Sequence, residues 1–191
     1  PPIPVERPFA GAAASSEVTT SARGQRRAAK VNSGPDVLVY GATGAIGSAA
    51  AQLVKSLGAK VTAVCDTDNV ELVRGLGADR VIDYTTSDFT KDEQKYDVFL
   101  DSVGKTSFRS CRRLLKPAGI YISSELGPLA QNPFLAMIAP LHGGKKVLFP
   151  IPKHDQAMVG YLRELIESGK FKPVIDRTYR LEQIVEAYWY V

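Results

Sequence analysis

The stretch VLVYGATGAIG, residues 37–47, runs from a β-branched segment through a glycine-rich turn into a helical pattern. Apolar residues recur at helical spacing from Ile46 to Leu57, and Gly58 stands where a left-handed cap would end the helix. A pyrophosphate can lie against such a turn only where backbone N–H groups face it and no Cβ blocks its approach. The stretch therefore predicts a strand–turn–helix unit that binds a dinucleotide, and glycines that only make a tight turn are the alternative. The candidate contacts are Gly41, Thr43, Gly44, Ala45, Ile46 and Gly47.

Short β-branched runs alternate with helical patterns from Asp36 onward, which is typical of parallel βαβ units whose sheet is buried on both faces. Six runs fit one doubly wound, parallel α/β sheet with helices on both faces. The expected strands are Val37–Tyr40, Val61–Cys65, Arg80–Ile82, Val98–Leu100, Ile120–Ser123 and Val147–Phe149. A later helix around Leu162, a strand-like Val174–Tyr179 and a last helix from about Glu182 complete the pattern.

Three segments are expected along the 191 residues. Residues 1–34, rich in proline, alanine and basic residues, are predicted to be a tail or the remnant of an N-terminal substrate domain, with an organelle transit peptide as the alternative. Residues 35–152 form the predicted dinucleotide-binding domain, and residues 153–191 a helix–strand–helix extension. Because the last helix has no packing partner after Val191, we expect a chain cut short at both ends.

Composition and charge narrow the classes of function. The chain is 45% hydrophobic and 23% charged, as in soluble globular proteins, and it holds no apolar run of about 18 residues that could span a membrane. The net charge is +4, but the basic residues are scattered among acidic ones, which argues against a nucleic-acid partner. Two distant cysteines and two isolated histidines, His142 and His154, predict no disulfide and no metal site, zinc included. We expect a cytoplasmic protein.

Asp66 follows the second expected strand, about 20 residues after the glycine turn, where a carboxylate can accept hydrogen bonds from ribose hydroxyls. A carboxylate there would repel a 2′-phosphate, and neither Thr67 nor Asp68 supplies a cation to neutralise one. We therefore expect NAD(H) to be favoured over NADP(H), with Asp66 and Thr67 at the ribose. Helix capping is the alternative for Asp66 and the favoured interpretation for Asp68.

Several longer phrases appear in a characteristic order. They are GATGAIG (41–47), LGADRVIDY (76–84), YDVFLDSVG (96–104), LKPAG (115–119) and GKFKPVID (169–176). With these phrases, the chain resembles the medium-chain dehydrogenase/reductase superfamily, specifically its zinc-independent quinone oxidoreductase-like branch. The resemblance implies a Rossmann-type sheet and an NAD(P)-dependent oxidoreductase that transfers hydride to or from a small carbonyl, enone or quinone. A non-catalytic dinucleotide-binding or interaction module of the same fold is the alternative.

The resemblance also implies roles for single residues. Tyr84 matches a tyrosine that approaches the cofactor phosphates, and Ser102 and Val103 match the stretch that passes under the riboses. Ser123 lies near the nicotinamide side, and Phe149 matches an aromatic residue that covers the nicotinamide. Packing in the core, at the sheet edge or in a strand-end turn is the alternative in each case. Substrate-orienting groups would come from the missing domain, so no catalytic residue is named, and this chain alone is expected to be inactive.

Two surface features complete the expectations. Relatives join sixth-strand edges into a continuous sheet, so Lys145–Pro150 is a candidate edge for a homodimer, shortened by its prolines. The basic residues Arg109, Arg112, Arg113 and Lys116 lie at helical spacing and are expected to form a solvated helix face. The expected ligands beyond the cofactor are small-molecule substrates.

Overall fold

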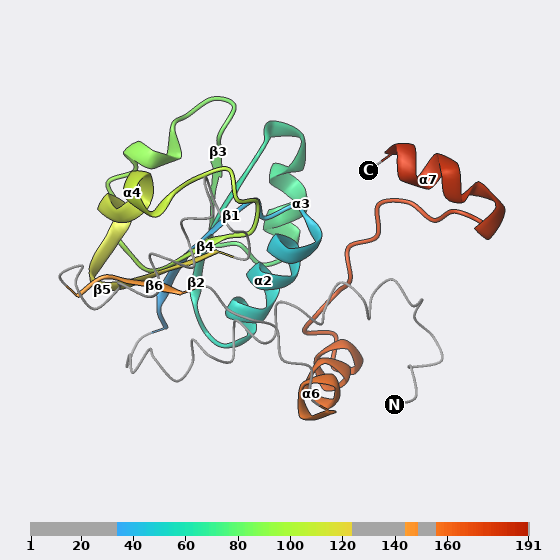
Figure 1. Ribbon diagram of the computed structural model, residues 1–191. Helices are drawn as coiled ribbons and strands as arrows, with labels where there is room; N and C mark the ends of the chain where they lie inside the picture. Colours follow the sequence, from blue (N-terminus) through green and yellow to red (C-terminus); the bar gives the residue numbers. More distant parts are fainter. Residues whose placement is uncertain (1–33, 124–143, 149–155, 191) are drawn as a thin grey trace.

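The fold is a six-stranded, all-parallel sheet in the order β3-β2-β1-β4-β5-β6 (Figure 1). The computed structural model describes residues 34–123, 144–148 and 156–190. The strands are β1 (Asp36–Tyr40), β2 (Lys60–Cys65), β3 (Arg80–Asp83), β4 (Tyr96–Asp101), β5 (Leu115–Ser123) and β6 (Lys146–Leu148). This order is that of doubly wound dinucleotide-binding folds, so the predicted fold class is confirmed.

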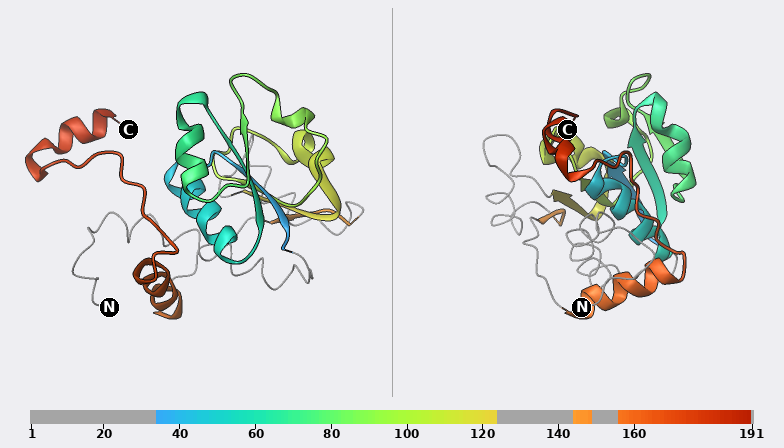
Figure 2. Two further views of the ribbon diagram at one scale, coloured as in Figure 1. Left: turned by 180° about the vertical axis from the view of Figure 1, so that it is seen from behind. Right: turned by 90° about the vertical axis from the view of Figure 1, so that its right-hand side faces the viewer.

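Helices cover both faces of the sheet (Figures 1 and 2). The helices are α2 (Ala45–Ser56), α3 (Val70–Gly75), α4 (Phe108–Cys111), α6 (Gln156–Glu167) and α7 (Ile184–Tyr190), with short 3-10 turns at η1 (Thr67–Asn69), η2 (Phe89–Lys91), η3 (Arg112–Leu114) and η6 (Leu181–Gln183). The crossovers through α2 and α3 lie on one face, and the α4–η3 segment lies on the other. A parallel sheet covered in this way is shielded from water on both sides.

Alternation along the strands builds two cores, one on each face. In β1, Val37 and Val39 pack under α2, whereas Leu38 between them packs on the α4 side. The α4-side core is aromatic, with Phe99 and Tyr121 stacked at a centroid distance of 5.4 Å. The strand interiors are mostly apolar because both faces are buried, which explains the β-branched runs of the sequence.

Gly58 ends α2 as predicted. Its φ of +85° is the left-handed conformation that glycine adopts without steric cost. The Gly58 N–H binds the Lys55 carbonyl and the Ala59 N–H binds the Val54 carbonyl, which is the Schellman arrangement. The chain then enters β2 directly, in register with β1 at Asp36↔Lys60.

The segment after α6 docks on α2 through a buried side chain. Gln52 of α2 donates from Nε2 to the Lys172 carbonyl at 2.9 Å and accepts from the Lys172 N–H at 2.7 Å. Phe171 beside it is 1% exposed. The Gln52 side chain thus makes the two hydrogen bonds to the Lys172 backbone that a neighbouring strand would otherwise make, and it holds the segment to the domain.

The strand expected at Val174–Tyr179 was wrong. Residues 170–180 are irregular, since they leave the sheet beyond Pro173 and no described strand lies beside them to complete a ladder. The chain leads instead to α7, which Figure 1 shows apart from the sheet. Apolar side chains around α7 are largely exposed, among them Leu181, Val185, Tyr188 and Trp189.

The basic cluster is split by the structure. Arg109, Arg112 and Arg113 are exposed on α4 and η3, as expected for a solvated face. Lys116, however, lies at the start of β5, where its ammonium pairs with Asp36 and Asp97 at 2.8 and 2.7 Å. Apart from Gly34, the predicted tail falls outside the described residues. No helix in the described parts of the chain is long and apolar enough to cross a bilayer.

Candidate functional site

The glycine turn follows β1, where the order of the strands in the sheet reverses. β1 pairs with β2 on one side and with β4 on the other, and the crossovers from these strands pass over opposite faces of the sheet. In open α/β sheets this arrangement leaves a crevice beyond the carboxyl ends of the strands, which is where ligands bind. The turn after Tyr40 and the loop after Asp101 both open onto it.

Two of the glycines are required by the fold itself. Gly41 has a φ of +78°, and a Cβ there would overlap the side chain of Val103. A Cβ on Gly47 would overlap the Gly41 carbonyl and stand 2.7 Å from the Ser102 hydroxyl. The start of α2 therefore packs against the turn and the end of β4 at a distance that no side chain permits.

Gly44 is different, because the fold does not require a glycine there. Its backbone is extended, with φ −67° and ψ 169°, and the nearest atom to an added Cβ is the Gly41 carbonyl oxygen at 3.8 Å. Gly44 and Ala45 are exposed, at the N-terminus of the 12-residue helix α2. A glycine that packing does not demand, at a helix N-terminus, leaves space for a ligand to approach the backbone.

The backbone donors of the turn fall into two groups. The N–H groups of Gly41 and Ala42 both bind the Val64 carbonyl at 3.2 Å, so they hold the turn to β2. The Gly44 N–H binds the Gly41 carbonyl at 3.3 Å. Within the described residues no backbone acceptor is found for the remaining N–H groups, which are those of Thr43, Ala45, Ile46 and Gly47. These four donors, at the positive end of the α2 dipole, can hold an anion.

The loop after β4 is held by a buried carboxylate. Asp101 is 2% exposed, and its Oδ1 accepts from the N–H groups of Val103 and Gly104 at 3.1 and 2.8 Å. Its Oδ2 accepts from the Tyr121 hydroxyl at 2.7 Å. Burial, followed by the charge of Asp101, raises the pKa of Tyr121, so this tyrosine stays a donor. The sequence reasoning missed Asp101, although an Asp three residues before a glycine is a turn signal.

Ser102 contacts the glycine turn through its side chain. Its hydroxyl donates to the Tyr40 carbonyl at 2.5 Å and lies 3.2 Å from the Gly41 carbonyl. Val103 is 37% exposed beside Gly41. The two residues thus reach the glycine turn, a contact that the sequence did not predict, and the Ser102 hydroxyl is already engaged there.

Asp66 fills one of the two roles that the sequence left open, that of a helix cap, and this does not preclude the other. Its Oδ1 caps η1 by accepting from the N–H and the amide of Asn69, at 3.1 and 2.7 Å. No described residue bonds its Oδ2, which leaves one carboxylate oxygen for a ligand. Asp68 lies inside η1, so the interpretation of Asp68 as the cap was wrong: the 3-10 turn begins one residue after Asp66.

Thr67 belongs to a hydroxyl network at the ends of β2 and β3. Its hydroxyl donates to Asp83 Oδ2 at 2.6 Å and lies 2.7 Å from the hydroxyl of Thr85. Hydrogen bonds from Thr67 and then Thr85 lower the pKa of Asp83. A second carboxylate, one whose pKa is lowered, therefore stands near the predicted ribose side.

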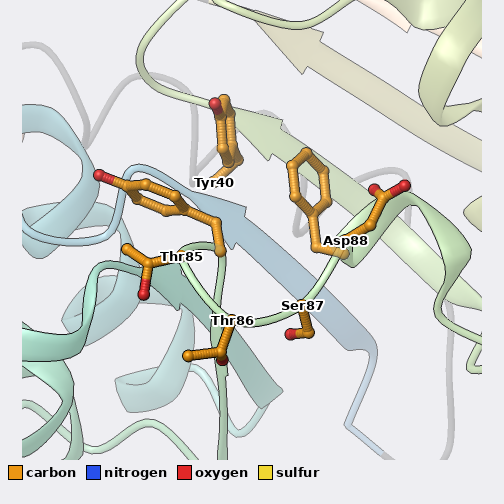
Figure 3. Close-up of a pocket in the computed structure, with 7 residues that line it drawn as sticks. Tyr40, Thr85, Thr86, Ser87 and Asp88 are labelled. Atoms are coloured by element: carbon orange, nitrogen blue, oxygen red, sulfur yellow. The ribbon is translucent and has the colours of Figure 1, made fainter.

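Tyr84 opens onto a shallow pocket of about 430 Å³ on the α4 side of the same sheet edge (Figure 3). Figure 3 shows Tyr40 on one side of the pocket and the Thr85–Asp88 loop on the other. Tyr84 is 50% exposed, and Tyr40 stacks on Phe89 at 4.8 Å. The hydroxyls of Thr86 and Ser87 bind the Asp83 carbonyl, and the pocket combines three aromatic side chains with the polar residues of this loop.

The nicotinamide side is only partly described. Ser123 is fully buried at the end of β5, which leaves its side chain no surface for a ligand. Phe149 lies outside the described residues. Burial raises the pKa of Cys65 and of Cys111 to about 11, so both thiols stay protonated at neutral pH. Among described residues no three His, Cys, Asp or Glu side chains gather closely enough to hold a metal ion.

Comparisons with known proteins agree with this geometry. The family model described as zinc-binding dehydrogenase matches residues 76–191. The mouse protein "NAD(P)H oxidoreductase RTN4IP1, mitochondrial" is 35% identical over 175 residues, covering 81% of this chain and 44% of that protein. The "Chloroplast envelope quinone oxidoreductase homolog" of Arabidopsis thaliana is 32% identical over 160 residues, covering 80% and 47%.

A comparison with solved structures finds the same class of protein. The solved quinone oxidoreductase of Pseudomonas syringae pv. Tomato DC3000 superposes with a TM-score of 0.74 at 26% identity, over 97% of this chain and 62% of that one. The chain spans about half the length of the curated relatives that it matches.

Proposed function

Because the chain belongs to the zinc-binding dehydrogenase family, in the quinone oxidoreductase-like branch of the medium-chain dehydrogenase/reductase superfamily, we propose that it is the cofactor-binding half of an NAD(P)-dependent oxidoreductase. The names of its relatives support hydride transfer to or from a small carbonyl, enone or quinone. Since the chain spans about half of those relatives, the complete reaction belongs to a longer protein, and this stretch alone is expected not to turn over.

Gly44 is the observation that carries this proposal. The fold leaves a glycine-sized opening in front of a helix N-terminus, where a Cβ would fit but a bound pyrophosphate would meet it. The unpaired N–H groups of Thr43, Ala45, Ile46 and Gly47 would hold the pyrophosphate, and the α2 dipole adds to their attraction. The bound nicotinamide ring supplies the hydride chemistry, and the protein supplies its orientation.

The electrostatics at the ends of β2 and β3 support NAD(H) over NADP(H). Asp66 keeps one oxygen for ribose hydroxyls, and Asp83 adds a second negative charge through the Thr67 network. A 2′-phosphate would face both carboxylates, and Coulomb repulsion in this partly exposed region lowers its affinity. Tyr84 is proposed to contact the phosphate side of the same cofactor.

The remaining expectations are kept as proposals. We propose that this half contributes no zinc ligand, since both thiols are buried in separate cores and protonated at neutral pH. The β6 edge, Lys146–Leu148, is the proposed homodimer contact. Two unpaired cysteines suit a reducing compartment, and cytoplasmic location stays a prediction because relatives bear mitochondrial and chloroplast names.

The Gly44→Ala variant tests pyrophosphate binding. We expect its free energy of unfolding to change by less than about 1 kcal/mol, since alanine adopts the observed φ and ψ and loses only a modest N-cap preference. Its affinity for NADH should fall at least about tenfold in titration calorimetry, because the Cβ occupies the ligand's approach. Gly160→Ala in α6 is the matched control, with an added Cβ in open space and no expected effect on binding. Wild-type affinity in Gly44→Ala would contradict the proposal.

The Asp66→Asn variant tests the cofactor preference. It retains an Oδ1 acceptor for the Asn69 N–H and so keeps the cap, but it removes the charge. We expect the wild-type chain to bind NADH more tightly than NADPH, and the preference to narrow by about tenfold in the variant at fixed ionic strength. Tighter binding of NADPH by the wild-type chain would show that the assignment of Asp66 is wrong.

A further inference from the structure

We propose that Ser102 is a positioning residue that fixes the Gly41–Ala42 peptide, so that the glycine turn presents N–H groups and no carbonyl to the cofactor. The proposal rests on the proposed function of the turn and goes beyond it, because Ser102 lies in the loop after β4, about 60 residues away in sequence. It assigns the serine hydroxyl to the protein backbone and not to a ribose.

The Gly41 carbonyl is where the contacts converge. It accepts from the Gly44 N–H at 3.3 Å and lies 3.2 Å from the Ser102 hydroxyl. It also packs so closely on the Cα of Gly47 that no side chain fits there. At the other end of the same peptide, the Ala42 N–H binds the Val64 carbonyl at 3.2 Å. The peptide is therefore held at both its oxygen and its nitrogen.

These hydrogen bonds matter because a glycine at position 41 does not by itself fix the orientation of the peptide that follows it. Gly41 has no side chain to restrict its backbone, so the orientation of the Gly41–Ala42 peptide depends on the contacts of its oxygen and nitrogen. A rotated peptide would direct a carbonyl oxygen toward the site where the pyrophosphate is proposed to bind. An oxygen there repels the anion, whereas the observed orientation keeps it among Ser102, Gly44 and Gly47.

Ser102 itself is fixed by the neighbouring strand β1 and by the last residue of its own strand, β4. Its N–H binds the Tyr40 carbonyl at 3.2 Å, and the same carbonyl accepts from its hydroxyl at 2.5 Å. The buried Asp101 holds the next two N–H groups and accepts from Tyr121. A rigid loop therefore carries the hydroxyl to the turn, and the order β1–β4 places them side by side.

The test compares Ser102→Ala with Ser56→Ala in the full 191-residue chain. Ser56 is the matched control, because its hydroxyl also donates to a backbone carbonyl, that of Leu53 at 2.8 Å, but at the far end of α2. Titration calorimetry measures the affinity for NADH and NADPH. Hydrogen–deuterium exchange of the ligand-free chain measures the protection of the turn, residues 41–47, where the amides of Gly41, Ala42 and Gly44 are hydrogen-bonded. We expect Ser102→Ala to bind both cofactors about fivefold more weakly, as for loss of one hydrogen bond, with an unchanged NADH:NADPH ratio.

The exchange data separate positioning from general stability. Faster exchange confined to residues 41–47 in Ser102→Ala, and wild-type behaviour in Ser56→Ala, would support the proposal. Unchanged affinity, or faster exchange across the whole sheet, would overturn it. If Ser102→Ala does not fold, Ser102→Cys keeps the bulk with a weak donor, and the same two measurements apply. A wild-type chain that binds neither cofactor would overturn the proposed function and the role of Ser102 with it.

Discussion

Lys116 pairs with two carboxylates at the amino end of the parallel sheet, whereas at the carboxyl end the glycine turn has backbone N–H groups for which no described residue supplies an acceptor. Both ends are formed by the same strands, so the difference between them lies in the residues that begin and follow each strand. At the amino end Asp36 of β1 and Asp97 of β4 share the Lys116 ammonium, which ties three strands together. At the amino end these strands are therefore joined by ion pairs.

The other amino-end contacts follow the same principle. Asp79, just before β3, accepts from Lys55 and from the Val61 N–H at 2.5 and 2.7 Å. Arg80 binds Asp92 with both terminal nitrogens, at 2.6 and 3.0 Å. Such charge-assisted bonds fix the crossovers where they enter the sheet. The amino-end groups named here are all paired, unlike the N–H groups at the N-terminus of α2.

The carboxyl end uses neutral donors and a buried carboxylate to shape backbone. Ser102 and Tyr121 act through hydroxyls, and Asp101 satisfies the loop that carries Ser102. The donors left over are those at the start of α2. One end of the sheet therefore stabilises the fold, while the other is where we propose that an anionic ligand binds, and variants at the two ends should separate stability from binding.

Gly47→Ala is expected to have the largest effect and to reduce stability and cofactor binding together. Its Cβ would overlap the Gly41 carbonyl, which is backbone and cannot move aside without displacing the turn. We expect a loss of about 3 kcal/mol in the free energy of unfolding, together with loss of NADH binding. Urea unfolding and calorimetry check both quantities. A stable Gly47→Ala chain would contradict the close packing of α2 on the turn, and Gly44→Ala, which should lose binding alone, is the comparison.

Lys116→Met is expected to have a smaller effect, confined to stability. It leaves Asp36 and Asp97 facing each other without their cation, but all three side chains keep about a quarter to a third of their surface in solvent. We expect a loss of about 1 kcal/mol in the free energy of unfolding after screening by water. The affinity for NADH should be unchanged, and the exposed Lys95→Met serves as control. Weaker NADH binding in Lys116→Met would show that the two ends of the sheet are not independent.

Local patterns predicted most of the fold and the first part of the site. The strand–turn–helix at residues 37–58 follows from neighbouring residues, since strand, turn and cap are each set within a few positions. The helix stop at Gly58 and the placement of Asp66 at a strand end were confirmed for the same reason. The sequence could not separate the role of Asp66 as the cap of η1 from the ribose role proposed for it, because both depend on which carboxylate oxygen faces which neighbour.

Contacts between distant residues could not be predicted. That Ser102 reaches the carbonyls of Tyr40 and Gly41 depends on β4 lying beside β1, which follows from strand order and not from either segment alone. The Gln52–Lys172 pairing spans 120 positions, and it explains why the chain after α6 joins α2 rather than forming a strand. A β-branched run becomes a strand only where a neighbour pairs with it.

The smallest expected effect is the pH dependence of two matched carboxylates. Burial alone would raise the pKa of Asp79, but hydrogen bonds from Lys55 and the Val61 N–H bring it below its ordinary value. Hydroxyl donors, first Thr67 and then Thr85, lower the pKa of Asp83 at the other end. A lowered pKa in the folded state means that each stabilising contribution is fully present above about pH 4 and is lost as the pH falls through the folded value.

Asp79→Asn and Asp83→Asn should therefore both flatten the acid limb of stability, by less than about 1 kcal/mol for the partly exposed Asp79. Salt distinguishes them. At about 1 M salt the contribution of Asp79 should shrink, since a cation provides part of it, while that of Asp83 should persist, since its donors are neutral. Urea unfolding at about pH 6 and about pH 3, in low and high salt, measures both. Equal salt sensitivity in the two variants would remove the distinction between an ionic amino end and a hydroxyl-bonded carboxyl end of the sheet.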